Sequence, residues 1–278
     1  MSLAISTLLT KARQKLFNSS SPRLDAEILL GHILGVTRSY LLTWPEKVLT
    51  ANQLAQFESL LKKRVQGQPI AYLIHQKEFW SLDLQITENT LIPRPETELL
   101  VEQVLARLSS LSNAQVIDLG TGSGAIALAI AKERPNCRIL ATDQSAACLA
   151  IAQNNAQQLR LTQVEFLCSD WWVKLKNRKA LIIVSNPPYI AEDDPHLSQG
   201  DVLYEPRSAL VAGPDGLSAI RQLIVQSHSH LVDGGWLLLE HGYNQAPNVQ
   251  QLFQNNGYQR VETYYDLAGL PRVTVGQK

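Results

Sequence analysis

The sequence predicts an α/β fold in which a doubly wound, mostly parallel sheet follows a small helical domain. Short apolar runs alternate with helical patterns from about residue 93 onward, which is the order of elements that builds such a sheet. A segment with period-two alternation precedes them. The first 74 residues carry only helical periodicity. These observations divide the chain into three predicted parts, 1–74, 75–92 and 93–278.

Residues 1–74 are predicted to form helices. Ser21-Pro22 starts one helix, because proline is favoured at the first helical position, and Gly35 can end it. Apolar residues recur between them at helical spacing: Ala26, Leu29, Leu30, Ile33 and Leu34. Thr50 can cap a second helix that ends near Gly67. One face of that helix carries Leu54, Phe57, Leu61 and Val65.

The segment 75–92 is predicted to be a β-hairpin linker. Leu82, Leu84 and Ile86 alternate with polar residues, as expected of a half-buried strand, and Glu88-Asn89-Thr90 is typical of a turn. The linker ends where Pro93-Arg94-Pro95-Glu96 opens a helix that runs to Leu108.

Residues 93–278 are predicted to form a seven-stranded Rossmann-like sheet. The expected strands are Gln115–Leu119, Arg138–Thr142, Val164–Cys168, Leu181–Ser185, Trp236–Glu240, Arg260–Tyr265 and Arg272–Val275. Helices at Ala125–Glu133 and Ala146–Leu159 separate the first three strands. The last two strands are close in the chain, so we expect an antiparallel hairpin at the C-terminus.

Composition limits the class of protein. The 278 residues carry a formal net charge of +0, with 45% apolar and 18% charged residues, which suits a folded domain. Nothing in this total favours duplex DNA or an anionic membrane as partner. The three cysteines, Cys137, Cys148 and Cys168, lack zinc-ligand spacing, so we expect free thiols and no metal. Without a signal-peptide pattern or a long apolar run, the protein is expected to be cytoplasmic.

A glycine-rich turn follows the first predicted strand of the sheet. Val116 to Gly124 contains the run Gly120-Thr121-Gly122-Ser123-Gly124, whose glycines let the backbone turn tightly and approach a ligand closely. With Ala125 the run also satisfies the dinucleotide fingerprint. Asp143 ends the next strand, where a carboxylate can accept hydrogen bonds from both ribose hydroxyls. These residues alone leave NAD and S-adenosylmethionine open.

Asp170-Trp171-Trp172 follows the third strand. At that edge of the sheet a carboxylate or backbone group can meet an adenine amino group, and an aromatic side chain can cover the ring. Asp170 and Trp171 are therefore candidate cofactor-binding residues. A packed aromatic pair with no ligand is the alternative.

The fourth strand leads into Asn186-Pro187-Pro188-Tyr189, which distinguishes between the two cofactors. Two prolines make the loop rigid and leave its carbonyls free, and the Asn186 side-chain oxygen can accept a second N–H bond. Tyr189 offers a flat face to a planar group. The loop thus suits a substrate amide or amino nitrogen that is held in line with a methyl donor, where positioning contributes most to the rate. Asn186, Pro187 and Tyr189 are the candidate catalytic residues, and with Pro188 they are the candidate substrate-binding residues.

At these residues the chain resembles the release-factor glutamine methyltransferase family (the PrmC/HemK type) within the Asn-Pro-Pro-Tyr class of S-adenosylmethionine-dependent methyltransferases. The resemblance extends over essentially the whole chain. It includes the stretches Leu91 to Glu98, Ser185 to Ile190, Gly200-Asp201-Val202, Glu205-Pro206 and Leu237 to Gly242.

The resemblance implies a specific reaction, the methylation of N5 of the glutamine in the Gly-Gly-Gln loop of peptide chain release factors. It implies that Gly120 to Gly124, Asp143 and Trp171 hold S-adenosylmethionine. It implies that Asn186 lies between cofactor and glutamine, with Pro187 to Tyr189 completing the glutamine pocket. The helical domain would dock the release factor, and the enzyme is expected to act as a monomer, without a membrane or nucleic-acid substrate.

Alternatives remain at this stage. The same loop could serve a ribosomal-protein glutamine or adenine N6, since adenine presents the same pair of N–H bonds. A nucleotide-binding module or an NAD enzyme is a different class. His241 is interpreted as a structural histidine, and Arg94 as either a site residue or a salt-bridge partner. His228 and His230 lie in a predicted helix without metal-ligand spacing.

Overall fold

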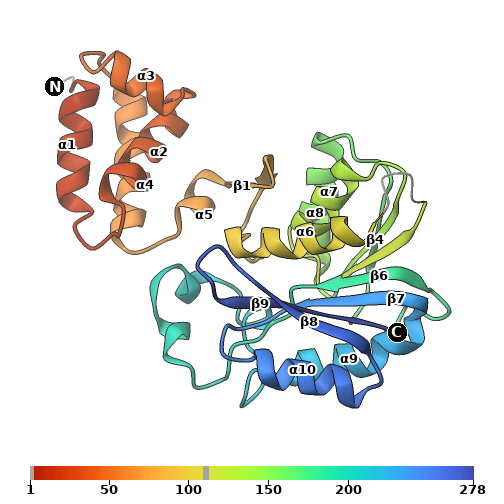
Figure 1. Ribbon diagram of the computed structural model, residues 1–278. Helices are drawn as coiled ribbons and strands as arrows, with labels where there is room; N and C mark the ends of the chain where they lie inside the picture. Colours follow the sequence, from red (N-terminus) through yellow and green to blue (C-terminus); the bar gives the residue numbers. More distant parts are fainter. Residues whose placement is uncertain (1–2, 109–112) are drawn as a thin grey trace. The chain divides into compact units, whose positions relative to one another are not determined.

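The computed structural model describes residues 3–108 and 113–278 (Figure 1). The first two residues of the predicted helical domain, and residues 109–112, lie outside them. The chain divides into two compact units. Unit 1 comprises Met1–Gln76 and Ser198–Tyr204, and unit 2 comprises Lys77–Leu197 and Glu205–Lys278. Among the described residues no helix is long and apolar enough to cross a membrane.

Unit 1 is helical, as the sequence predicts. Its α-helices are α1 (Ile5–Lys15), α2 (Pro22–Leu34), α3 (Arg38–Thr43), α4 (Ala51–Val65) and α5 (Ile70–Ile74). Gly35 ends α2 in the left-handed conformation, with φ of 65°. Thr50 caps α4 through a reciprocal capping box with Gln53. The apolar faces meet in a core that includes Leu29, Leu30, Phe57 and Leu61, whereas Val65 at the end of α4 is 46% exposed.

A distant segment of the chain also belongs to unit 1. The short 3-10 helix η3 (Gly200–Tyr204) contacts the C-terminal end of α4 through Arg64, whose guanidinium pairs with Asp25 at 2.7 Å and Asp201 at 3.4 Å. The Tyr204 hydroxyl donates to the carbonyl of Gln66. Local sequence patterns carry no information on these contacts, because the partners are more than a hundred residues apart.

The hairpin and the helix that follows it open unit 2. Strands β1 (Gln76–Phe79) and β2 (Leu82–Gln85) form a two-stranded sheet, which confirms the predicted hairpin. The next helix begins later than predicted, with a 3-10 turn η1 (Pro95–Thr97) before α6 (Glu98–Arg107). Arg94 precedes a proline and is extended, with φ −99° and ψ 145°, because the proline ring disfavours the helical region for the residue before it.

The main sheet has seven strands in the order β5-β4-β3-β6-β7-β9-β8. They are β3 (Gln115–Leu119), β4 (Arg138–Asp143), β5 (Val164–Cys168), β6 (Ala180–Ser185), β7 (Leu231–Glu240), β8 (Gln259–Tyr265) and β9 (Pro271–Gln277). The first five run parallel, and β9 pairs antiparallel with both β7 and β8, so the predicted fold class is confirmed. Strand β7 begins five residues earlier than predicted, with Gly234-Gly235 and a register shift in its first half.

Helices cover both faces of this sheet. Figure 1 shows α6, α7 (Ala125–Glu133) and α8 (Ala146–Gln158) on one face and α9 (Ser218–His230) and α10 (Ala246–Asn255) on the other. Fully buried side chains of β3, β6, β7, α9 and α10 form one core, including Ile117, Ile183, Leu237, Leu223 and Phe253. The chain proceeds from β3 outward through β4 to β5 and then returns to place β6 on the other side of β3. Ligands of doubly wound folds bind at the carboxyl ends of strands at such a switch point.

We expect Thr50→Ala to destabilise the helix α4. The substitution removes the cap of one backbone N–H, and such caps contribute about 1 kcal/mol. Amide hydrogen exchange of α4 peptides in the full chain measures the opening free energy. Thr43→Ala is the control, because the Thr43 hydroxyl only bonds the Ser39 carbonyl of its own helix, and we expect a change within about 0.5 kcal/mol. Equal effects of the two substitutions would contradict the capping role.

Candidate active site

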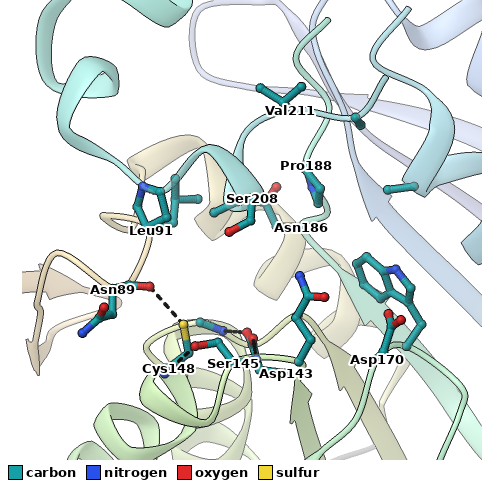
Figure 2. A pocket seen from close by; sticks show the side chains of 18 of the residues that line it. Asn89, Leu91, Asp143, Ser145, Cys148, Asp170, Asn186, Pro188, Ser208 and Val211 are labelled. Carbon is teal, nitrogen blue, oxygen red and sulfur yellow. Dashed lines mark hydrogen bonds between the residues drawn. The ribbon is translucent and has the colours of Figure 1, made fainter. Parts of the chain in front are cut away.

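A cavity of about 630 Å³ opens at the switch point of the sheet, within unit 2. This volume is in the range of small-molecule sites. Seven of the residues predicted to bind ligand line it: Gly120, Gly122, Asp143, Asp170, Trp171, Asn186 and Pro188. Figure 2 shows Asp143 and Ser145 on one side of the cavity and Asn186, Pro188 and Ser208 on the other. The cavity therefore brings together the ends of four strands that are far apart in the sequence.

The glycine-rich turn after β3 forms one wall of the cavity. Gly120 and Gly122 line it with left-handed φ angles of 72° and 57°, which L side chains rarely adopt. A Cβ on Gly120 would lie 3.5 Å from the Trp171 ring, so the turn and this ring face each other. The bare backbone of the turn is thus exposed to the cavity opposite an aromatic surface.

The other three residues of the turn do not line the cavity. The Thr121 hydroxyl is buried and donates to Asp118 Oδ2 at 2.6 Å, and its backbone N–H donates to the Thr142 carbonyl at 2.8 Å. The carbonyl of buried Ser123 accepts a hydrogen bond from Asn155 at 2.9 Å. In the structure these residues hold the shape of the turn, and their predicted contact with the cofactor stays a prediction.

Asp143, at the end of β4, connects the turn to the next helix. Its Oδ2 accepts a hydrogen bond from the Gly122 N–H at 2.9 Å, and its Oδ1 accepts one from the Ser145 N–H at 2.8 Å. Each carboxylate oxygen has a second lone pair, so both can still accept a hydroxyl hydrogen bond from the cavity. Burial raises the pKa of Asp143, and its backbone hydrogen bonds oppose that effect.

The two tryptophans after β5 have different environments. Trp171 lines the cavity together with the exposed Asp170. Trp172 is buried on the other side, where its ring stacks on His230 with centroids 4.4 Å apart. The structure therefore separates the two interpretations of this segment, because one tryptophan faces the cavity and the other packs in the core.

The loop Asn186 to Tyr189 follows β6 directly. Asn186 and Pro188 line the cavity, and Pro187 is buried. Tyr189 is not among the cavity-lining residues. Its ring packs against the core of the sheet, and its hydroxyl donates to Glu240 Oε1 at 3.2 Å. The predicted contact of Tyr189 with substrate stays a prediction.

Residues for which the sequence predicted no role in the site hold this loop in place. The Gln245 side-chain amide donates to the Tyr189 carbonyl at 2.9 Å. A Cβ on Gly216 would lie 2.3 Å from the same carbonyl oxygen, so only glycine fits beside the loop. The Ser185 hydroxyl donates to the Leu119 carbonyl at 2.6 Å, which connects the end of β6 to the end of β3. The backbone of the loop is thus fixed from three sides.

Arg94 and His241, which the sequence did not assign to the reaction, both contact other residues of the fold. Arg94 forms an ion pair with Glu205, whose side chain is buried and whose Oε1 accepts the Ile92 N–H at 2.9 Å. His241 is buried, with Nε2 2.8 Å from the Thr274 hydroxyl and Nδ1 2.9 Å from the Gly242 carbonyl. Both ring nitrogens are therefore hydrogen-bonded within the fold, as the structural interpretation of His241 expects.

Two buried carboxyl groups lie beneath the site. Burial raises the pKa of Asp118 to about 7, although the Thr121 hydroxyl stabilises its ionised form. Burial likewise raises the pKa of Glu240 to about 7, against the opposing effect of the neighbouring Thr97 and Tyr189 hydroxyls. Both groups change charge near neutral pH directly behind the loops that line the cavity.

We expect Glu240→Gln to change stability in a pH-dependent way. The folded chain keeps the Glu240 proton up to about pH 7, whereas the ordinary value is 4.5, so the wild type loses free energy of unfolding as the pH rises between these values. Relative to wild type, the variant should gain up to roughly 3 kcal/mol from pH 5 to pH 8. Urea denaturation at four pH values measures this. Ser227→Ala, which removes a buried neutral hydroxyl, is the control with a pH-independent effect, and the same flat profile for Glu240→Gln would refute the expectation.

Comparison with known proteins agrees with the geometry of this site. Residues 7–74 match the family described as PrmC N-terminal domain, and residues 95–265 match the family described as methyltransferase small domain. Among solved structures, a methyltransferase from Pyrococcus furiosus has a TM-score of 0.54 at 16% identity, covering 82% of this chain and 99% of that chain. At this identity the likeness shows a shared fold.

Curated relatives are similar over almost the whole length. The release factor glutamine methyltransferase of Escherichia coli (strain K12) is 50% identical over 269 residues, which are 97% of each chain. That of Vibrio cholerae serotype O1 is 47% identical over 280 residues, covering 100% of this chain and 98% of the relative. The chain therefore belongs to the release factor glutamine methyltransferase family.

Proposed function

We propose that this chain transfers a methyl group from S-adenosyl-L-methionine to N5 of the glutamine in the Gly-Gly-Gln motif of peptide chain release factors. The observation that carries the proposal is the position of Asn186. It lines the same cavity as Gly120, Gly122 and Asp143, in a chain 50% identical to the release factor glutamine methyltransferase of Escherichia coli.

The cavity residues fit S-adenosylmethionine. Gly120 and Gly122 leave bare backbone toward the ligand, Asp143 keeps lone pairs for ribose hydroxyls, and Trp171 offers an aromatic surface to the adenine ring, with Asp170 beside it. Thr121, Ser123 and Gly124 support the turn. When bound, the cofactor supplies a methyl group on a sulfonium, whose leaving group departs neutral. The remaining task of the chain is therefore to orient the acceptor.

Orientation of the acceptor nitrogen is the role proposed for the Asn186 to Tyr189 loop. The Asn186 side-chain oxygen and the Pro187 carbonyl accept the two N–H bonds of the glutamine amide, which aligns its nitrogen lone pair with the donor. Pro188 and Tyr189 complete the pocket. The loop suits this role because two prolines and the contacts of Gln245 and Gly216 restrict its movement, so little freedom is lost when substrate binds.

The three predicted parts of the chain have different proposed roles. We assign the helical segment 1–74 to docking of the release factor, the hairpin 75–92 to linking, and 93–278 to methyl transfer. The cavity is lined entirely by residues of unit 2, so we propose that a single chain, acting as a monomer, suffices for the site. Release factors act in translation, and this supports a cytoplasmic site of action.

Mass spectrometry of the modified protein tests the proposal. A release factor is incubated with the enzyme and methyl-deuterated S-adenosylmethionine, and its peptides are mapped. We expect one labelled methyl group on the glutamine of the Gly-Gly-Gln peptide. A release factor with glutamate at that position is the control, because its carboxylate offers no N–H. Duplex DNA and ribosomal protein are assayed in parallel, and label on either of these but not on the release factor would exclude the proposed substrate.

Asn186→Ala separates cofactor binding from turnover. We expect kcat to fall by about 100-fold, the loss that follows from misplacing a reacting group. The affinity for S-adenosylhomocysteine, measured by calorimetry, should stay within about threefold, because the carboxamide acts on the acceptor. Asn255→Ala, on the exposed end of α10, is the matched control. Full activity of Asn186→Ala would remove Asn186 from the proposed mechanism.

A further inference from the structure

Asn186 has a buried partner on the other side from the substrate pocket. Its Nδ2 atom donates to the hydroxyl of Thr97 at 3.2 Å, although the two residues are 89 positions apart in the chain. Thr97 ends the 3-10 turn η1 and is only 4% exposed. It does not line the cavity, so it cannot touch the substrate itself. Its hydrogen-bond contact with the site is the Asn186 amide.

The hydrogen bond to Thr97 sets the direction of the Asn186 amide. The Thr97 oxygen Oγ1 is the acceptor, and only the NH₂ end of a carboxamide can donate such a bond. The Oδ1 end is therefore turned away from Thr97 and is available on the cavity side.

We propose that Thr97 is a positioning residue that fixes the Asn186 amide with its oxygen toward the acceptor, so that the site selects groups that present N–H donors. This inference rests on the proposed function, which places the acceptor nitrogen beside Asn186. A flipped amide would point two N–H bonds at the two N–H bonds of the glutamine. The orientation thus favours an amide over a carboxylate, since a carboxylate brings only oxygens to the same place.

The closing experiment compares Thr97→Val with Thr97→Ser. Valine keeps the shape but loses the hydroxyl, and it leaves Asn186 Nδ2 without its acceptor. We expect kcat to fall by about tenfold or more, because an orphaned buried hydrogen bond costs this much. The affinity for S-adenosylhomocysteine should stay within about threefold, and Thr97→Ser should stay within about threefold of wild type in both. Equal kcat for Thr97→Val and wild type would overturn the inference.

A second measurement does not depend on activity. In ¹⁵N-labelled protein the side-chain NH₂ signals of Asn186, assigned by their loss in Asn186→Ala, should shift in Thr97→Val and stay in place in Thr97→Ser. Unchanged signals in Thr97→Val would overturn the inference even in an enzyme that methylates release factor. Conversely, if the wild-type enzyme does not methylate a release factor, the proposed function is wrong. The NH₂ signals would still show the orientation of the Asn186 amide.

Thr97→Ala takes the place of Thr97→Val in both measurements if valine prevents folding, because alanine also lacks the hydroxyl. Wild-type kcat and unchanged NH₂ signals in Thr97→Ala would overturn the inference.

Discussion

The parallel pairing of β3 with β6 is the constraint on which the site depends. It places the ends of two strands, about 65 residues apart in the chain, next to each other, and the Ser185 hydroxyl fixes them through the Leu119 carbonyl. The glycine-rich turn continues one strand and the Asn186 loop continues the other. A cavity that needs a bare backbone on one side and a carboxamide on the other can form only where these two strands are neighbours. Side chains of β3, β6 and β7 are buried in one core, so the rigidity of the sheet extends to both loops.

Much of this arrangement could be predicted from the sequence, because the relevant patterns are local. Apolar runs, turn residues and the glycine-rich segment each lie within about ten positions, and the strands and helices of the sheet follow from them. The predictions were wrong where a local rule competed with another. The helix after the linker starts at Glu98, because Pro95 keeps Arg94 extended. Trp171 and Trp172 could not be told apart, since both lie outside a periodic element and their difference is tertiary.

The supports of the Asn186 loop could not be predicted for a related reason. Thr97, Gly216, Glu240 and Gln245 come from four separate parts of the chain, and no local pattern identifies any of them as a partner of this loop. A threonine before a helix is typical of an N-cap, and a glutamate at the end of a strand is typical of the protein surface. Only the tertiary fold makes Thr97 a partner of Asn186 and gives Glu240 a buried environment. Long-range hydrogen bonds therefore hold those residues of the site that local sequence patterns do not predict.

The buried carboxylate of Glu240 shows what such a support requires. An apolar residue at this position of β7 would fit the core without any penalty for burying charge, and burial is the main reason that the pKa of Glu240 rises to about 7. The Oε1 atom of Glu240 accepts the hydrogen bond of the Tyr189 hydroxyl at 3.2 Å, and Tyr189 is the last residue of the Asn186 loop. An apolar side chain would leave this hydroxyl without its acceptor. The stability lost by burying Glu240 is therefore coupled to the position of the loop that faces the acceptor.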